Sequence, residues 1–102
     1  MIKLEIYIPQ THIEEVKKAI FIAGAGKIGN YDYCSWQTLG EGQFKPCENS
    51  NPFIGEQDVV ETVSELKLEV VCDDNCIEKV IKALKESHPY ETPAYQYWSV
   101  NK

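Results

Sequence analysis

The chain has 102 residues, of which 43% are hydrophobic and 25% are charged, with a formal net charge of -6. This composition is typical of a globular protein and not of a disordered or membrane-spanning chain. The acidic balance argues against nucleic-acid binding and against a basic membrane-surface helix, because both need an excess of Lys and Arg. The length predicts a single domain, residues 1–102, whose thin core would gain from association with other copies.

The first residues predict a strand followed by a helix. Apolar and polar residues alternate over residues 2–8, the pattern of a half-buried strand, and Pro9 ends it. Thr11 and Glu14 then have the spacing of a capping box, which indicates a helix start. Apolar residues recur at helical spacing up to Gly24, a residue that commonly ends helices.

The middle of the chain predicts two more strands around an irregular segment. Residues 30–39 are rich in Tyr, Trp and Thr, which favour a strand. Residues 40–58 carry clusters of Gly and Pro, and an irregular stretch of this length is usually functional or wrapped around a partner. Alternation resumes over residues 61–72. The apolar face of this strand consists of Leu66, Leu68, Val70 and Cys72.

The last third repeats the order of helix and strand. Asn75 and Glu78 have capping-box spacing, a helical apolar stripe follows, and Pro89 excludes His88 from helical conformation. Residues 94–100 are predicted to form a final strand. The chain is therefore predicted to be an α+β protein, a ferredoxin-like βαββαβ sandwich in which an antiparallel sheet carries two helices on one face.

The face of this sheet without helices predicts self-association. Large aromatic side chains that project from it need a partner to shield them from water. The candidates for this role are Trp36, Tyr95, Tyr97 and Trp98.

A glycine-rich segment over residues 24–29, GAGKIG, matches the letters of the dinucleotide-binding fingerprint. That fingerprint needs a strand before it and a helix after it, so that the helix N-terminus meets the pyrophosphate. Here the order is reversed, which argues against nucleotide binding in this mode. The preferred interpretation is a connection whose glycines adopt positive φ, and a backbone loop that receives a ligand or partner stays open.

The segment HPYETPAY, residues 88–95, is predicted to be an extended corner between helix and strand, because two prolines restrict it. His88 and Glu91 could chelate a metal ion or share a proton, but a metal site would need a further ligand. A hydrogen-bonded structural corner is the preferred interpretation.

The four cysteines have neither redox nor zinc spacing, and nothing around them indicates a lowered thiol pKa except that Cys76 is expected near a helix N-terminus. Small thiols in a reducing cytoplasm explain them. No secretory leader and no membrane-spanning run is recognised.

Four ordered motifs resemble a known family. They are GAGKIGNYDYCSW, GEGQFKP, NPFIGE and HPYETPAY, and they extend from about Gly24 to Tyr95. Together they are similar to the domain inserted in the middle of many bacterial Nif-three-like proteins, which are also named NGG-interacting-factor-like proteins and GTP cyclohydrolase I type 2 homologues. That domain is similar in fold to PII signalling proteins and to CutA, which associate as trimers. The resemblance therefore implies a stand-alone PII/CutA-like domain with a trimeric tendency.

The resemblance also implies which residues bind a ligand or partner. They are Gly24, Gly26, Gly29, Asn30, Gly40, Gly42, Phe44, Pro46, Pro52, Gly55, His88, Pro89, Tyr90 and Glu91. In full-length family members the paired metal ions are bound by two flanking halves outside this sequence. We therefore expect no catalytic residue and no cofactor, and the only candidate metal ligands are His88 and Glu91.

These observations predict a non-catalytic, trimeric binding or regulatory module in the cytoplasm. Its small-molecule ligand or protein partner would bind a cleft between subunits, lined by residues 40–58 and 88–95. One alternative is a metal-binding protein or an accessory subunit of a dinuclear-metal hydrolase that uses His88 and Glu91. Another is a structural unit that docks on a separately encoded dinuclear-metal protein.

Overall fold

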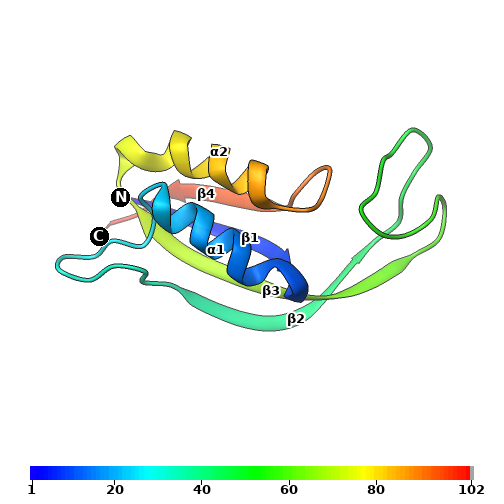
Figure 1. The fold of residues 1–102 in the computed structure, drawn as a ribbon, viewed down its shortest axis with the longest axis horizontal. Helices are drawn as coiled ribbons and strands as arrows, with labels where there is room; N and C mark the ends of the chain where they lie inside the picture. The colour runs from blue at the N-terminus through cyan, green and yellow to red at the C-terminus, as the bar shows by residue number, and fades with distance from the viewer. Residues whose placement is uncertain (102) are drawn as a thin grey trace.

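A computed structural model describes residues 1–101 of the chain. Its strands and helices, in chain order, are β1 (Ile2–Pro9), α1 (Ile13–Ile22), β2 (Trp36–Phe44), β3 (Glu61–Cys72), α2 (Ile77–Ser87) and β4 (Tyr95–Ser99), and the short 3-10 helices η1 (Gln10–His12) and η2 (Asp74–Cys76) precede α1 and α2. The strands form one antiparallel sheet in the order β2-β3-β1-β4. Both α-helices cover the same face of it (Figure 1). The predicted ferredoxin-like α+β fold is confirmed.

The hydrophobic core lies between this sheet and the two helices. Strands β1 and β3 pair directly, for example Ile6 with Leu68, so their alternating apolar residues share one face. Val16 and Ile20 of α1 and Val80 of α2 are fully buried against that face. Burying an aliphatic side chain of this size contributes roughly 1.5–3 kcal/mol. The predicted apolar faces of the first and third strands are thus confirmed.

Both predicted capping boxes are wrong. The N-cap residues of the two α-helices are His12 and Cys76, and neither makes a side-chain cap hydrogen bond. A turn of 3-10 helix precedes each α-helix instead, and within the second turn the backbone N–H of Cys76 donates to the carbonyl of Asp73 at 3.0 Å. Such backbone bonds satisfy N–H groups that a side-chain cap would otherwise satisfy.

The predicted helix ends are confirmed. Helix α1 ends at Ile22, and Gly24 follows with φ at +117°, a conformation that favours glycine. Helix α2 ends at Ser87, and His88 is extended, with φ at -76° and ψ at 135°, as the following proline requires.

Strand β2 begins six residues later and ends five residues later than the sequence predicts. Residues 30–35 are irregular backbone apart from an isolated bridge between Ile28 and Tyr31, and Tyr33 has a positive φ of 59°. Strand β2 continues through Gly40 and Gly42 because β3 is long enough to pair with it along its whole length, as far as Phe44 opposite Glu61. Pairing with a distant strand thus outweighs the weak strand preference of glycine.

The register divides the predicted aromatic patch between the two faces of the sheet. Trp36 and Trp98 lie on the face without helices. Tyr95 and Tyr97 pair with Ile6 and Leu4, so they lie on the helix-covered face instead. Of the four candidates for the open face, Trp36 and Trp98 therefore lie on it, and Tyr95 and Tyr97 do not.

The centre of the open face is charged. Lys3 Nζ lies 2.9 Å from Glu69 Oε1, and Lys67 Nζ lies 3.2 Å from Glu5 Oε1. These pairs join β1 to β3 and raise the pKa of Lys67 and lower that of Glu69, because each charge favours the other. The open face is consequently charged at its centre, and its exposed tryptophans lie on the two edge strands.

The molecule is elongated, with principal extents of 46 × 24 × 23 Å. The hairpin of β2 and β3 extends beyond the helices and carries the connection over residues 45–60 at one end (Figure 1). The glycine-rich connection after α1 and both chain termini lie toward the other end. No helix within residues 1–101 has the length and hydrophobicity needed to cross a membrane.

Candidate ligand-binding site

Two segments far apart in the sequence meet at the end of the molecule that carries the long connection. The backbone N–H of Asn51 donates to Glu91 Oε1 at 2.8 Å. The ring of Tyr90 lies 5.9 Å from that of Phe44 and 6.4 Å from that of Phe53, between ring centroids. The connection after β2 and the segment after α2 are therefore joined by a hydrogen bond and by aromatic packing.

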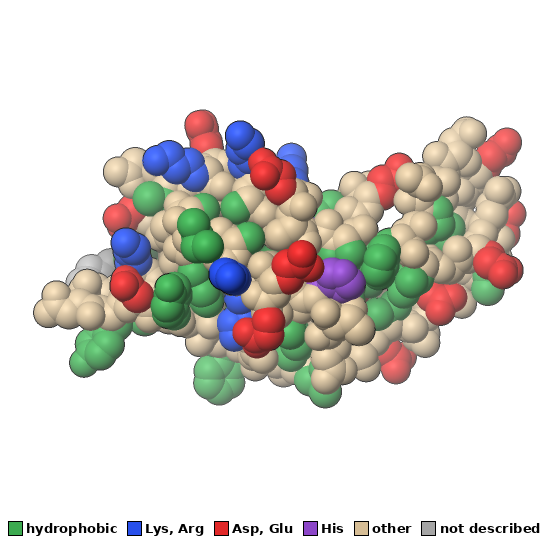
Figure 2. Space-filling view, viewed as in Figure 1, with side chains coloured by type: hydrophobic (Ala, Val, Ile, Leu, Met, Phe, Trp, Pro, Cys, Tyr) green, Lys and Arg blue, Asp and Glu red, His purple; other side chains and the backbone are tan. Residues whose placement is uncertain are grey.

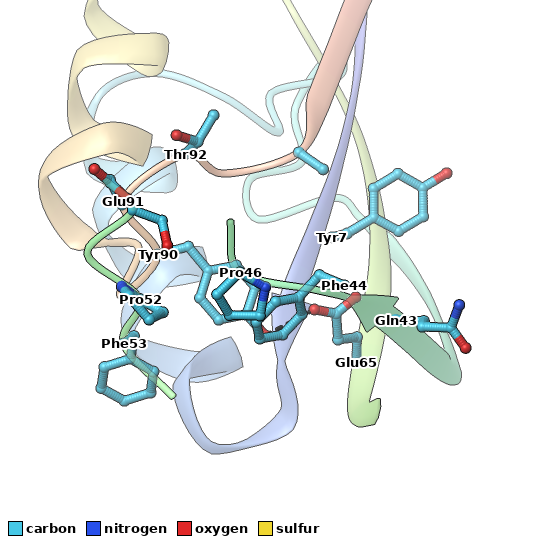
Figure 3. A pocket seen from close by; sticks show the side chains of 12 residues that line it. Tyr7, Gln43, Phe44, Pro46, Pro52, Phe53, Glu65, Tyr90, Glu91 and Thr92 are labelled. Carbon is cyan, nitrogen blue, oxygen red and sulfur yellow. Dashed lines mark hydrogen bonds between the residues drawn. The ribbon is translucent and has the colours of Figure 1, made fainter. Parts of the chain in front are cut away.

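These segments line a partly open cavity of about 260 Å³ (Figure 3). Its apolar wall consists of Phe44, Pro46, Pro52, Phe53 and Tyr90. Its remaining lining residues are Tyr7, Gln43, Ser50, Glu65, Glu91, Thr92 and Ala94. Concave sites with mainly apolar walls and a few polar groups are the usual form of small-molecule sites.

His88 anchors the segment after α2 to the sheet. Its side chain is buried, and its Nε2 lies 2.8 Å from the carbonyl oxygen of Tyr7 on β1. Its Nδ1 accepts the backbone N–H of Tyr90 at 3.2 Å, so the proton of the neutral ring is on Nε2, which donates to Tyr7. Burial lowers the pKa of His88 and favours this neutral form. His88 is a hydrogen-bonded corner, in line with the preferred sequence interpretation.

Tyr90 and Glu65 form the polar base of the cavity. The Tyr90 hydroxyl donates to Glu65 Oε2 at 2.9 Å. Burial, together with this hydrogen bond and the charge of Glu65, raises the pKa of Tyr90 well above its usual range. Tyr90 is therefore a neutral hydrogen-bond donor.

Gly42 leaves the space that the Glu65 side chain occupies. A Cβ atom at position 42 would overlap the Glu65 carboxylate, whereas one at Gly40 would meet nothing within 4 Å. Gly55 has a positive φ of 96°, and a Cβ there would lie 3.5 Å from both Phe44 and Pro46. Of these three predicted glycines, Gly42 and Gly55 border the site and Gly40 does not.

The other predicted glycines lie away from the cavity. Gly24, Gly26, Gly29 and Asn30 belong to the connection after α1, toward the opposite end of the molecule (Figure 1). Gly24, Gly26 and Gly29 all have positive φ, as the sequence interpretation of a connection expected. A Cβ at Gly24 would lie 3.0 Å from Cys76 Sγ, and one at Gly26 would lie 3.0 Å from the Phe21 ring. The predicted residues therefore do not form a single site.

The arrangement of His88 and Glu91 argues against a metal centre. Both ring nitrogens of His88 are engaged in hydrogen bonds, and Glu91 accepts a backbone N–H. Among residues 1–101, no group of three or more His, Cys, Asp or Glu side chains is arranged to hold a metal ion.

The sequence analysis did not assign Tyr7 and Glu65 to the site. The alternation of apolar and polar residues in strands β1 and β3 places both side chains on the polar face. Tyr7 is the last residue of that face before Pro9. Nothing local indicates that the segment 88–95 reaches them, because that contact depends on strand register and on how α2 packs. Phe53 lies within residues 40–58, the segment that the sequence predicts to line the cleft.

Comparisons with known proteins agree with this fold. No family model matches the chain. The GTP cyclohydrolase 1 type 2 homologue of Halalkalibacterium halodurans is 48% identical over 96 residues, which cover 94% of this chain and 26% of that protein. The chain thus spans about a quarter of the length of the curated relatives it matches.

Two solved structures extend the comparison. A Bacillus cereus protein related to NIF3 matches with a TM-score of 0.84 and 38% identity, over 99% of this chain and 26% of that one. The PII-like protein CutA from Nostoc sp. PCC 7120 matches with a TM-score of 0.69 and 17% identity, over 99% of this chain and 82% of that one, which shows the fold alone. The chain is therefore similar in sequence to about a quarter of the length of these GTP cyclohydrolase 1 type 2 homologues and of the NIF3-related protein, and it has a CutA/PII-like fold.

Proposed function

We propose that this domain is a non-catalytic, self-associating module whose ligand or partner binds the cavity between residues 43–53 and 90–94. The observation that carries the proposal is the meeting of these two segments around one apolar hollow, held by the Asn51–Glu91 hydrogen bond and the ring of Tyr90. A preformed hollow with aromatic walls suits binding, since little chain entropy is lost when a ligand enters it.

The chemistry of the lining supports binding rather than catalysis. A general acid or base needs a pKa near the working pH and access to the substrate. The pKa of Tyr90 is raised far above that range, and its hydroxyl is already bonded to Glu65. His88 is buried behind the cavity with both ring nitrogens engaged.

Self-association, with a trimer as the expected form, is supported by the edges of the sheet. Trp36 on β2 is 68% exposed and Trp98 on β4 is 43% exposed, and these strands are the two edges of the sheet. Exposed tryptophans beside unpaired strand edges are typical of protein interfaces. The CutA-like fold is compatible with a homo-oligomer.

We place the module in the cytoplasm. All four cysteines are free, and Cys72 is fully buried with a pKa raised by burial. Unpaired thiols are typical of reducing compartments.

The binding proposal is tested by NMR titration with a collection of organic cations, anions and neutral fragments. We expect at least one class to shift the backbone resonances of the cavity residues. The variant Phe53→Ala removes one wall and should weaken binding about tenfold, because a buried aromatic contact is worth roughly 1.4 kcal/mol. Ile22→Ala is the matched control: Ile22 is an exposed apolar residue on α1, outside the cavity lining. The proposal fails if no class shifts the cavity resonances or if Phe53→Ala binds as tightly as the wild type.

A further inference from the structure

The cavity carries two negative charges that no basic side chain balances. Glu65 and Glu91 belong to its lining, which contains no Lys, Arg or His. None of the ion pairs within residues 1–101 involves either glutamate. Glu5 and Glu69, on the same sheet face as Glu65, are by contrast both paired with lysines. The two carboxylates of the cavity therefore remain available to a charge from outside the chain.

Both carboxylates keep the capacity to accept further hydrogen bonds. Glu65 accepts the Tyr90 hydroxyl on Oε2, and Glu91 accepts the Asn51 N–H on Oε1. An ionised carboxylate has about four acceptor positions on its two oxygens. The existing bonds thus orient each group without saturating it, which is the arrangement expected of a preorganised recognition site.

The aromatic walls, like the carboxylates, attract positively charged groups. Phe44, Phe53 and Tyr90 surround the hollow (Figure 3), and the faces of such rings attract cations. Their apolar surface would at the same time bury the hydrocarbon part of a ligand.

The surface around the cavity is acidic as well. The connection over residues 45–60 contains Glu48, Glu56 and Asp58 against one lysine, Lys45. Acidic side chains are prominent at this end of the molecule in the space-filling view (Figure 2). The negative electrostatic potential of these side chains attracts cations toward the cavity and repels anions from it.

We propose that the cavity binds a small organic cation, an ammonium or guanidinium group on an apolar ring or chain. This rests on the binding function proposed above and adds the chemical class of the ligand. The charged group would bond to Glu65 or to Glu91 while the apolar part packs against the aromatic wall. A nucleoside triphosphate or another phosphorylated ligand would meet two carboxylates and no cation, so this cavity discriminates against it.

Three compounds with the same ring and different charge test the proposal. They are phenethylamine, 2-phenylethanol and phenylacetate, each titrated into the wild-type protein while cavity amide resonances are followed by NMR. We expect phenethylamine to bind about tenfold more tightly than 2-phenylethanol, and phenylacetate not to saturate at roughly 10 mM. Added salt should weaken phenethylamine binding and leave 2-phenylethanol binding unchanged.

Charge-neutralising variants locate the effect. Glu65→Gln and Glu91→Gln should each weaken phenethylamine binding about threefold to tenfold and leave 2-phenylethanol binding unchanged, because the shape of the side chain is kept. Glu78→Gln is the matched control, since Glu78 is an exposed glutamate on α2, outside both the lining and the acidic connection. Amide spectra that match the wild type establish that the variants are folded.

Each outcome decides a separate claim. Equal binding of all three compounds, or preferential binding of phenylacetate, overturns the cation proposal and leaves a binding cavity. The cation proposal is also overturned if phenethylamine does not bind while an anionic or neutral fragment shifts the cavity resonances. The cavity then remains a binding site. Failure of every fragment class overturns both proposals. A lysine-containing peptide that binds where phenethylamine does not overturns the small-molecule class.

Discussion

Glu65 illustrates how the surroundings of a residue set its role. It lies on the same face of β3 as Lys67 and Glu69, which form ion pairs with β1. Glu65 itself lies opposite Pro9 on one side and Gly40 on the other, so neither neighbouring strand offers it a cation. It bonds instead to Tyr90, 25 residues away in the sequence.

At this scale we predict different effects for two neighbouring glycine variants. Gly42→Ala places a Cβ where the Glu65 carboxylate lies and should displace it from the Tyr90 hydroxyl. The pKa of Tyr90 should then fall toward its ordinary value, because the bond and charge of Glu65 help to raise it. Stability should fall by about 1.5–3 kcal/mol, the usual contribution of a hydrogen bond to a charged group.

The matched control is Gly40→Ala, since a Cβ at that position meets nothing within 4 Å. An NMR titration of the Tyr90 ring and urea unfolding of both variants provide the measurements. A Tyr90 titration in Gly42→Ala identical to that of the wild type would show that Glu65 does not depend on this glycine.

Three elements are joined at one buried imidazole. His88 ends α2, bonds to the carbonyl of Tyr7 on β1 and accepts the N–H of Tyr90 in the segment that leads to β4. Protonation of His88 Nδ1 would place an N–H of the ring against the backbone N–H of Tyr90. The two donors would repel each other and detach the segment after α2 from the ring. The position of the cavity wall therefore depends on the neutral state of His88.

We predict a loss of stability on acidification that depends on His88. Burial lowers the pKa of His88 below 6.5 in the folded state, so below pH 6.5 the unfolded chain binds more protons than the folded one. The contribution of neutral His88 to stability is present above pH 6.5 and is lost as the pH falls from 6.5 toward the folded-state pKa. The free energy of unfolding should change by at most about 1.4 kcal/mol for each pH unit in this range.

Urea unfolding at pH 7.5 and at pH 5 measures this effect. The decrease should be smaller in His88→Gln than in the wild type and should persist in His12→Gln, because the His12 ring bonds to Thr11 and packs against Phe53 and does not join α2 to β1. An equal decrease in all three proteins would mean that His88 carries none of the pH dependence.

On the scale of the whole molecule, charge and exposed aromatic surface are separated. Ion pairs occupy the centre of the open face, while the exposed tryptophans lie on the edge strands β2 and β4. Copies of the domain would therefore meet along their edges with less burial of charge than a face-to-face contact would need, since desolvating ion pairs is costly.

We predict that Trp36→Lys abolishes self-association. A charge on the edge of β2 disfavours pairing with another copy. Sedimentation velocity at about 100 µM should show a trimer for the wild type and a monomer for Trp36→Lys. Ile22→Lys, which adds the same charge on the exposed surface of α1, should remain a trimer. A monomeric wild type at that concentration would contradict the proposal.

The sequence by itself determined the order of the elements, the buried faces of β1 and β3 and the ends of both α-helices. These features depend on residue periodicity and on Gly or Pro at set positions, and such signals act over a few neighbouring residues. Gly24 and His88 end their helices where the pattern predicts.

Only the tertiary structure decided the limits of β2, the face on which Tyr95 and Tyr97 lie, and the cavity. Each depends on pairing between distant segments: β2 extends to Phe44 because β3 continues opposite it, and Glu65 meets Tyr90 because α2 delivers the next segment to the sheet. A shift of one residue in register turns every side chain of a strand to the other face, so local patterns do not specify such contacts.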